Sequence, residues 1–171
     1  MDYSKQRWVL KTPPHLPYLD TIVNQYPDAA IIHTHRDPMD VMGSISSLSC
    51  TLHSAFSDDI DPVEIAANEV IFFSEMLKVG MAQRDAMTDK DSRFFDVQFS
   101  DIITDPIAII DNLYRHFDFD FTLEARQAMQ NYLNHRPRDK HGTHQYTLKD
   151  FGLSREEHTH LFQEYNQRYG F

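Results

Sequence analysis

The sequence predicts an α/β fold in which a small, mainly parallel sheet is flanked by helices and followed by a helical C-terminal part. Three short runs rich in β-branched or aromatic residues indicate strands at Arg7–Lys11, Ala29–Thr34 and Arg93–Phe99. Apolar residues at helical spacing separate these runs. An alternation of strand and helix is typical of parallel α/β sheets, so we expect one layered core.

The helices are predicted by apolar spacing and by residues that start helices. Apolar residues recur at helical spacing after the first and second runs, at Leu16, Leu19, Val23 and Tyr26, and at Val41, Ile45, Leu48 and Leu52. Helix-start signals occur at Asp61 with Pro62 and Glu64, at Asp105 with Pro106, at Thr122, and at Ser154 with Glu157. The helix after Asp61 should be the longest.

Composition indicates a single domain over residues 1–171, because 41% of the residues are hydrophobic and the length is usual for one core. The net charge of −10 argues against nucleic acid or anionic membranes as partners, since both require a basic surface. Cys50 is the only cysteine, and no apolar stretch approaches the length of a membrane span. We expect a cytoplasmic protein without disulfides.

The segment HTHRDPMDVMGSISSL, residues 33–48, places Arg36 at the end of a predicted strand and Ser44 eight residues later, on the following helix. Ligands of open α/β sheets bind at this end of the strands, and the guanidinium fork suits phosphate. The alternative is that Arg36 pairs with Asp37 or Asp40.

This segment resembles the 3′-phosphate motif of the sulfotransferases that use 3′-phosphoadenosine 5′-phosphosulfate (PAPS), in which an Arg at a strand end is followed eight residues later by a Ser. Arg36 and Ser44 match both residue types and their spacing. The resemblance implies that these two residues bind the 3′-phosphate of the nucleotide, and it extends in family order from Arg7 to Gly170.

A second match is RWVLKTPPHLPYLD, residues 7–20, which resembles the family's strand and loop with a Lys and a His. The resemblance implies that Lys11 stabilises charge on the sulfuryl oxygens and that His15 is the general base for the acceptor. His suits proton transfer near neutrality. The spacing departs from the family, because Pro13 and Pro14 place the His four residues after the Lys instead of two.

A third match is RDKHGTHQYTLKDFGL, residues 138–153, which resembles a C-terminal loop that closes over the nucleotide. It implies roles in 3′-phosphate binding for Lys140 and Gly142, and also for Arg138. The alternative is a solvated turn. A weaker match at FFDVQFSDIITDP, residues 94–106, resembles a late strand with its following loop and has a structural role.

The family's Gly-, Ser- and Thr-rich loop, which binds the 5′-phosphosulfate, has no counterpart in these 171 residues, since no glycine precedes Gly43. The resemblance therefore implies a P-loop-NTPase-like sulfotransferase fold that is incomplete at its N-terminal side. An incomplete sheet leaves an unpaired edge, so we expect a homodimer or a partner chain to cover it.

The function expected from the resemblance is transfer of a sulfuryl group from PAPS to a hydroxyl or amine of a small-molecule acceptor. Two alternatives remain: a non-catalytic module that binds 3′-phosphoadenosine nucleotides, and an interaction subunit completed by another chain. No metal is expected, because the ten histidines form no zinc motif and Cys50 has no thiolate partner. The sequence does not identify the acceptor.

Overall fold

The computed structural model describes residues 8–135 and 146–171, in which short strands alternate with helices. The first half contains the 3₁₀ helix η2 (Pro13–Tyr18), α1 (Leu19–Gln25), β1 (Ile31–His35), α2 (Pro38–His53), α3 (Pro62–Ala86), α4 (Lys90–Arg93) and β2 (Phe94–Gln98). The second half contains α5 (Phe99–Thr104), α6 (Pro106–His116), α7 (Leu123–His135), the 3₁₀ helix η3 (Leu148–Phe151), α8 (Arg155–His158), the 3₁₀ helix η4 (Thr159–Phe162) and α9 (Gln163–Tyr169).

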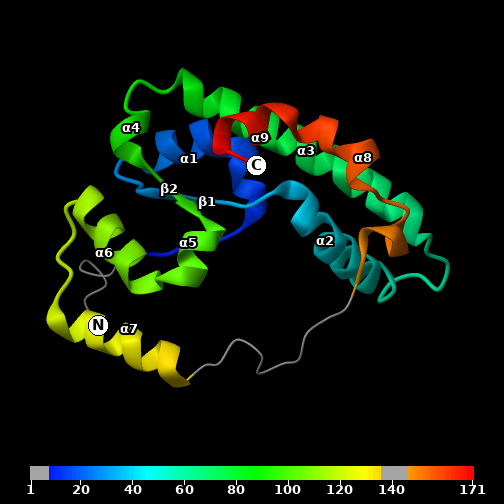
Figure 1. The fold of residues 1–171 in the computed structure, drawn as a ribbon. Coiled ribbons are helices and arrows are strands. Elements are labelled where there is room, and N and C mark those ends of the chain that lie inside the picture. The colour runs from blue at the N-terminus through cyan, green and yellow to red at the C-terminus, as the bar shows by residue number, and fades with distance from the viewer. Residues whose placement is uncertain (1–7, 136–145) are drawn as a thin grey trace.

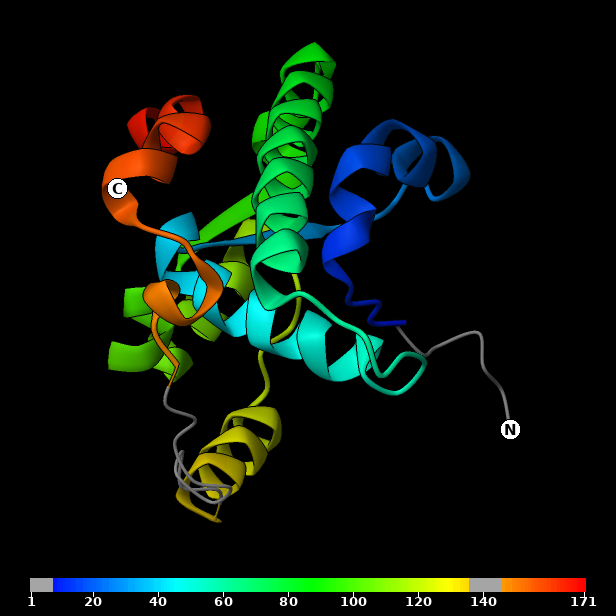
Figure 2. The same cartoon turned by 90° about the vertical axis from the view of Figure 1, so that its right-hand side faces the viewer.

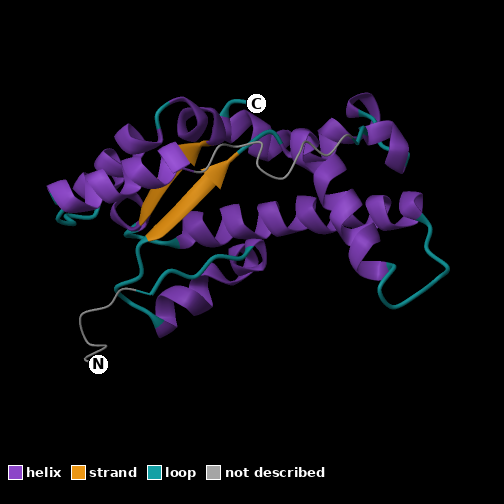
Figure 3. Ribbon diagram, turned by 90° about the horizontal axis from the view of Figure 1, so that it is seen from below, coloured by secondary structure: helices purple, strands orange, loops and turns teal. Residues whose placement is uncertain are grey.

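The sheet of the described residues consists of β1 and β2, which pair in parallel from Ile31 opposite Phe94 to His35 opposite Gln98. Parallel neighbours require a crossover connection, and α2, α3 and α4 form it. Helices α1, α3 and α9 lie on one side of the strands, and α5 and α6 lie on the other (Figure 1). Figure 3 shows the two strands side by side among the helices. The predicted α/β class and its parallel sheet are confirmed.

The expected strand at Arg7–Lys11 is wrong for its described residues, because residues 8–11 form no strand. Trp8, Val9 and Leu10 are 81%, 89% and 65% exposed, so no layer covers this segment. A β-rich sequence forms a strand only where a neighbour accepts its backbone hydrogen bonds, and neither β1 nor β2 pairs with it.

The predicted helix starts are confirmed. The Asp61 carboxylate accepts hydrogen bonds from the backbone amides of Val63 and Glu64, at 2.8 and 3.3 Å, at the start of the 25-residue α3. The same first-turn cap occurs where Asp105 accepts from Ala108, Thr122 from Ala125 and Ser154 from Glu157. These bonds satisfy amides that have no partner within the helix.

Three segments differ from the sequence-based expectation in detail. The expected loop after β2 is the short helix α5, which leads directly into the Asp105 cap of α6. The helix expected after Ser154 is divided into α8, η4 and α9, which ends at Gly170 in the left-handed region with φ of 82°. The helix expected from Leu16 to Tyr26 is confirmed only in part, because the residues up to Tyr18 belong to the 3₁₀ helix η2 and α1 begins at Leu19.

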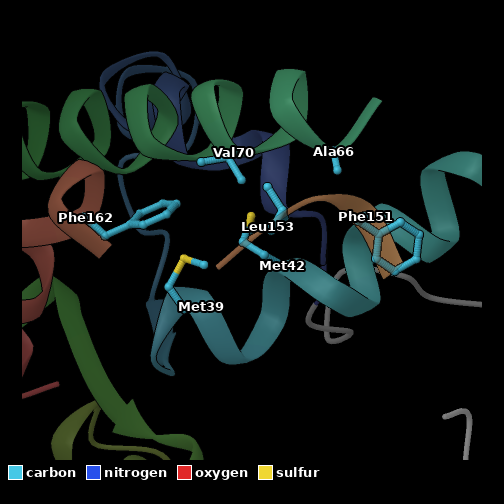
Figure 4. Packing of buried hydrophobic residues seen from close by; sticks show 7 residues of the cluster. All are labelled: Met39, Met42, Ala66, Val70, Phe151, Leu153 and Phe162. Carbon is cyan, nitrogen blue, oxygen red and sulfur yellow. The ribbon is translucent and has the colours of Figure 1, made fainter. Parts of the chain in front are cut away.

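The hydrophobic core lies where α2, α3 and the C-terminal segment meet. Met39 and Met42 of α2 face Ala66 and Val70 of α3, and the C-terminal segment contributes Phe151, Leu153 and Phe162 (Figure 4). Phe162 is the largest fully buried side chain of the described residues, at 2% exposed. This core fixes the position of α2, and therefore of the strand end that precedes it.

Helix α3 is the central element, with η2 and α1 on one side and the C-terminal helices on the other (Figure 2). Gly80 permits close approach of η2, since a Cβ there would lie 2.5 Å from the Cγ atom of Leu16. The Gln83 side-chain amide donates to the Pro17 carbonyl at 2.8 Å. In the part of the chain that the structure describes, no helix combines the length and apolarity that a bilayer span requires.

Candidate functional site

The site begins where β1 ends and α2 starts, and Arg36 is exposed in the short connection between them. Asp37 is the N-cap of α2, and its Oδ1 atom accepts from the Met39 amide at 2.9 Å. Phe99 follows the end of β2, and the Arg36 guanidinium carbon lies 4.6 Å from the centroid of its ring. Arg36 thus occupies the carboxyl edge of the sheet, where α/β proteins bind ligands.

The alternative in which Arg36 pairs with Asp37 or Asp40 is wrong. Arg155, at the start of α8, donates to the Asp37 carboxylate at 2.6 Å and also to the Asp40 carboxylate. The hydrogen bond to Asp37 raises the pKa of the Arg155 guanidinium, although burial acts in the opposite direction. Within residues 8–135 and 146–171, the Arg36 guanidinium has no ion pair or hydrogen bond, so its fork is available to an anion.

Ser44 lies two turns into α2 on the exposed face of the helix. Met39, Met42 and Gly43 form the opposite, buried face. The i, i+4 spacing places Asp40 and Ser44 on one side of α2, one turn apart. The Ser44 hydroxyl is exposed and is bonded to no other side chain of the described segments, so it is available to a ligand.

A buried polar cluster lies directly behind Arg36. His35 is 1% exposed; its Nδ1 atom lies 2.8 Å from the Tyr165 hydroxyl, and its Nε2 atom lies 2.8 Å from Asp96 Oδ1. The Tyr169 ring stacks on the His35 ring with 3.8 Å between centroids. Arg84 of α3 donates to both Asp96 oxygens at 2.6 Å. The cluster therefore joins α3, both strands and α9.

The electrostatics of this cluster favour a neutral His33 and an ionised Asp96. Burial, reinforced by the neighbouring His35, lowers the pKa of His33 to about 3. Burial alone would raise the pKa of Asp96, but hydrogen bonds from His35 and Arg84 outweigh it and hold that pKa well below its usual range. Burial raises the pKa of the Tyr165 hydroxyl, and a backbone hydrogen bond from Arg36 partly offsets this.

Nitrogen and oxygen atoms of His33, His35 and Asp96 lie within 4.8 Å of one another, a separation that a metal ion could bridge. Both ring nitrogens of His35 are already bonded, and both Asp96 oxygens accept from Arg84. A cation there would also lie beside the Arg84 guanidinium, which repels it. We therefore assign the cluster a structural role as a cross-link behind the site.

Lys11 and His15 lie on the other segment that the sequence analysis singled out. Lys11 is exposed in the extended stretch before η2, and His15 is partly buried within η2, where its backbone amide donates to the Thr12 carbonyl at 3.2 Å. Neither side chain contacts Arg36 or Ser44 among the residues described. The structure thus places Arg36 at the end of β1 and Ser44 within the following helix α2, and it holds Lys11 and His15 on a separate segment that packs on α3.

The remaining sequence-predicted residues, Arg138, Lys140 and Gly142, lie outside the described residues.

Sequence reasoning missed three residues around Arg36: Phe99, Arg155 and Tyr165. Arg155 follows the Ser154 cap and resembles a solvated helix residue, although its partners lie 118 and 115 residues earlier. The only local signal for this contact is that Asp37 and Asp40 have no basic residue one helical turn later. This signal does not identify Arg155 as their partner.

Comparison with known proteins shows similarity to one family. Residues 2–123 match the model of the Sulfotransferase family. The chain is similar to the crystal structure of sulfotransferase STF1 from Mycobacterium tuberculosis H37Rv, with 34% identity and a TM-score of 0.78 over 93% of this chain. It is also similar to sulfotransferase STF9 from Mycobacterium avium, with 26% identity and a TM-score of 0.85 over 96% of this chain.

The chain spans only part of both solved relatives, 40% of STF1 and 42% of STF9. No curated protein matches it.

Proposed function

Because this chain belongs to the sulfotransferase family, we propose that it binds a 3′-phosphoadenosine nucleotide, with the 3′-phosphate on Arg36 and Ser44. The observation that carries the proposal is the free guanidinium of Arg36 at the carboxyl edge of the sheet. Both neighbouring carboxylates, Asp37 and Asp40, are bound by Arg155 instead. An unpaired Arg at this edge, with a hydroxyl on the next helix, is the donor set that a phosphate requires.

The position of Arg36 is fixed from two sides, which supports a binding role. The Phe99 ring lies under its guanidinium, and the buried His35 next to it in sequence is bonded to Asp96 and Tyr165. A preorganised side chain loses less conformational entropy when the ligand binds. In this proposal Arg138, Lys140 and Gly142 add donors to the same phosphate, as the family resemblance implies.

We further propose that the reaction is in-line transfer of a sulfuryl group from PAPS to a hydroxyl or amine of a small-molecule acceptor. The acceptor oxygen or nitrogen forms a bond to sulfur while the bond from sulfur to the 5′-phosphate oxygen breaks. His15 takes the acceptor's proton, and Lys11 balances charge on the sulfuryl oxygens. The products are the sulfated acceptor and 3′-phosphoadenosine 5′-phosphate, and a cytoplasmic setting fits a chain whose only cysteine is Cys50.

A second candidate is a nucleotide-binding module without turnover. It is favoured by the lack of a Gly-, Ser- and Thr-rich loop in these 171 residues, since that loop supplies the backbone amides for the 5′-phosphosulfate in the family. A second copy or a partner chain that covers the two-stranded sheet would then supply the missing part. Both candidates share the Arg36 site and differ in product formation.

The proposal is tested by calorimetric titration with 3′-phosphoadenosine 5′-phosphate. We expect saturable binding by the wild type and loss of binding in Arg36→Ala. Arg115→Ala is the matched control, since it removes one exposed guanidinium that pairs with Asp111 of its own helix, α6. No binding by a folded wild type, or equal binding by Arg36→Ala, would overturn the proposal.

Product formation separates the two candidates. Incubation with PAPS and a panel of phenols, alcohols and amines should release 3′-phosphoadenosine 5′-phosphate if the chain transfers the sulfuryl group. His15→Gln should then lower the rate by about 10²-fold or more, as expected when a general base is lost, without weakening nucleotide binding. Nucleotide binding without any turnover supports the binding module.

A further inference from the structure

Arg155 is bonded to two acids that flank the proposed phosphate site. Its guanidinium donates to Asp37 Oδ2 at 2.6 Å and to Asp40 Oδ1. Asp37 directly follows Arg36, and its other oxygen caps α2. Asp40 lies midway in sequence between Arg36 and Ser44, on the same side of α2 as Ser44. Both carboxylates therefore belong to the same strand-to-helix segment as Arg36 and Ser44.

Two uncompensated carboxylates at this position would oppose the ligand. A 3′-phosphate carries up to two negative charges, and each carboxylate repels it across a partly aqueous gap of several ångströms. Asp37 and Asp40 are thus two acidic residues at a site whose proposed ligand is an anion. Arg155 is the cation that the structure places on both of them.

A role in stability alone does not account for this arrangement. The Arg155 side chain is 50% exposed, and ion pairs at such exposure contribute little to folding. The position of Arg155 is nevertheless fixed, because Ser154 caps α8 and both Leu153 and Phe162 are buried in the core. The C-terminal segment thus presents this guanidinium to Asp37 and Asp40 without needing the ion pairs to hold the segment in place.

We infer that Arg155 is a positioning residue of the nucleotide site: it neutralises Asp37 and Asp40, so that the 3′-phosphate can reach Arg36 and Ser44. The inference rests on the proposed function, because it assumes that the anion is bound at Arg36. Nucleotide affinity then depends on a residue of α8 that lies 118 residues after Asp37 in sequence. The role is electrostatic, and Arg155 acts through the two acids instead of touching the phosphate.

The test is a titration of five proteins with 3′-phosphoadenosine 5′-phosphate. They are the wild type, Arg155→Ala, Asp40→Asn, the Arg155→Ala/Asp40→Asn double variant and the exposed-arginine control Arg115→Ala. Arg155→Ala should bind roughly tenfold more weakly, the size expected when a carboxylate some 6 Å from a dianion loses its counter-ion in a largely aqueous medium. Asp40→Asn should bind at least as tightly as wild type. The double variant should recover part of the loss, because the repelling charge of Asp40 is gone while that of Asp37 remains.

Salt gives a second readout. The difference between wild type and Arg155→Ala should shrink as ionic strength rises from about 0.01 to 1 M, since screening weakens repulsion. Thermal melting of each variant confirms that it is folded.

The outcomes separate this inference from the proposed function. Wild-type binding that is lost in Arg36→Ala but unchanged in Arg155→Ala overturns the inference and leaves the nucleotide site standing. A loss in Arg155→Ala that Asp40→Asn does not restore even in part also overturns it, because Arg155 would then touch the phosphate or act only through folding. No wild-type binding overturns both.

Discussion

The Nδ1 atom of His35 lies 2.8 Å from the hydroxyl of Tyr165, 130 residues further along the chain. This contact bonds the last helix, α9, to the strand that leads into Arg36. Because His35 is almost completely buried, water cannot replace either partner. The contact makes the C-terminal helix part of the support of the proposed site.

Replacing Tyr165 by Phe should therefore destabilise the fold. Tyr165→Phe leaves the buried Nδ1 atom of His35 without its partner, and such a loss costs about 1–3 kcal/mol. Tyr169→Phe is the control, since the Tyr169 hydroxyl makes only a long contact of 3.4 Å with Arg84. Urea unfolding should show the larger loss in Tyr165→Phe, and equal losses in the two variants would contradict this account.

Acid should destabilise the protein through His33. The pKa of His33 is about 3 in the folded protein and about 6.5 when unfolded, so the unfolded chain binds a proton that the folded protein does not. Stability is therefore unaffected above pH 6.5 and falls below it. Between pH 6.5 and 5 the free energy of unfolding should drop by about 2 kcal/mol through this group.

His33→Gln removes this titration, so its stability should fall less over the same pH range. The difference between the two proteins isolates His33 from the other histidines, which both contain. Parallel pH profiles of wild type and His33→Gln would show that His33 is protonated as easily in the folded protein as in the unfolded chain.

Gly80 should be intolerant of a side chain, because a Cβ there would lie 2.5 Å from Leu16 Cγ. We expect Gly80→Ala to cost about 1–3 kcal/mol as η2 is forced away from α3, partly offset by the better helix propensity of Ala. In Leu16→Ala the obstructing atoms are absent, so adding Gly80→Ala there should cost little or nothing. An equal cost in both backgrounds would show that the close approach is not the cause.

Phe162 should be the most sensitive position of the core. Phe162→Ala removes a side chain that is 2% exposed and should cost about 3–5 kcal/mol. Phe56→Ala removes the same atoms from a position that is 92% exposed and should change stability by less than about 0.5 kcal/mol. Chemical denaturation of both variants checks the contrast, and comparable losses would indicate a different core.

The sequence predicts best those elements that are determined by residues close to one another in the chain. Asp61 and Asp105 start their helices because each side chain caps amides two or three residues away. Arg36 was expected at a strand end, and it lies there, because the β-rich run before it and the Asp37 cap after it are both local signals. The parallel sheet followed from the alternation of strand and helix.

The features that sequence did not predict depend on distant partners. Residues 8–11 have strand composition but no neighbouring strand with which to pair, and this depends on the arrangement of the whole sheet. Arg155 directly follows the predicted helix start at Ser154, and its bonds to Asp37 and Asp40 exist only because the C-terminal segment packs across α2. Contacts across more than 100 residues leave no periodicity in one sequence.

The central claim, that Arg36 binds the 3′-phosphate, is tested most directly by comparing two nucleotides on two proteins. Adenosine 5′-monophosphate lacks the 3′-phosphate of 3′-phosphoadenosine 5′-phosphate but is otherwise the same ligand. Wild type should prefer the 3′-phosphorylated nucleotide by roughly 10- to 100-fold, the value of a charge-assisted bond of about 1.5–3 kcal/mol, and Arg36→Ala should lose that preference. Equal binding of both nucleotides by wild type, or an undiminished preference in Arg36→Ala, would contradict the account.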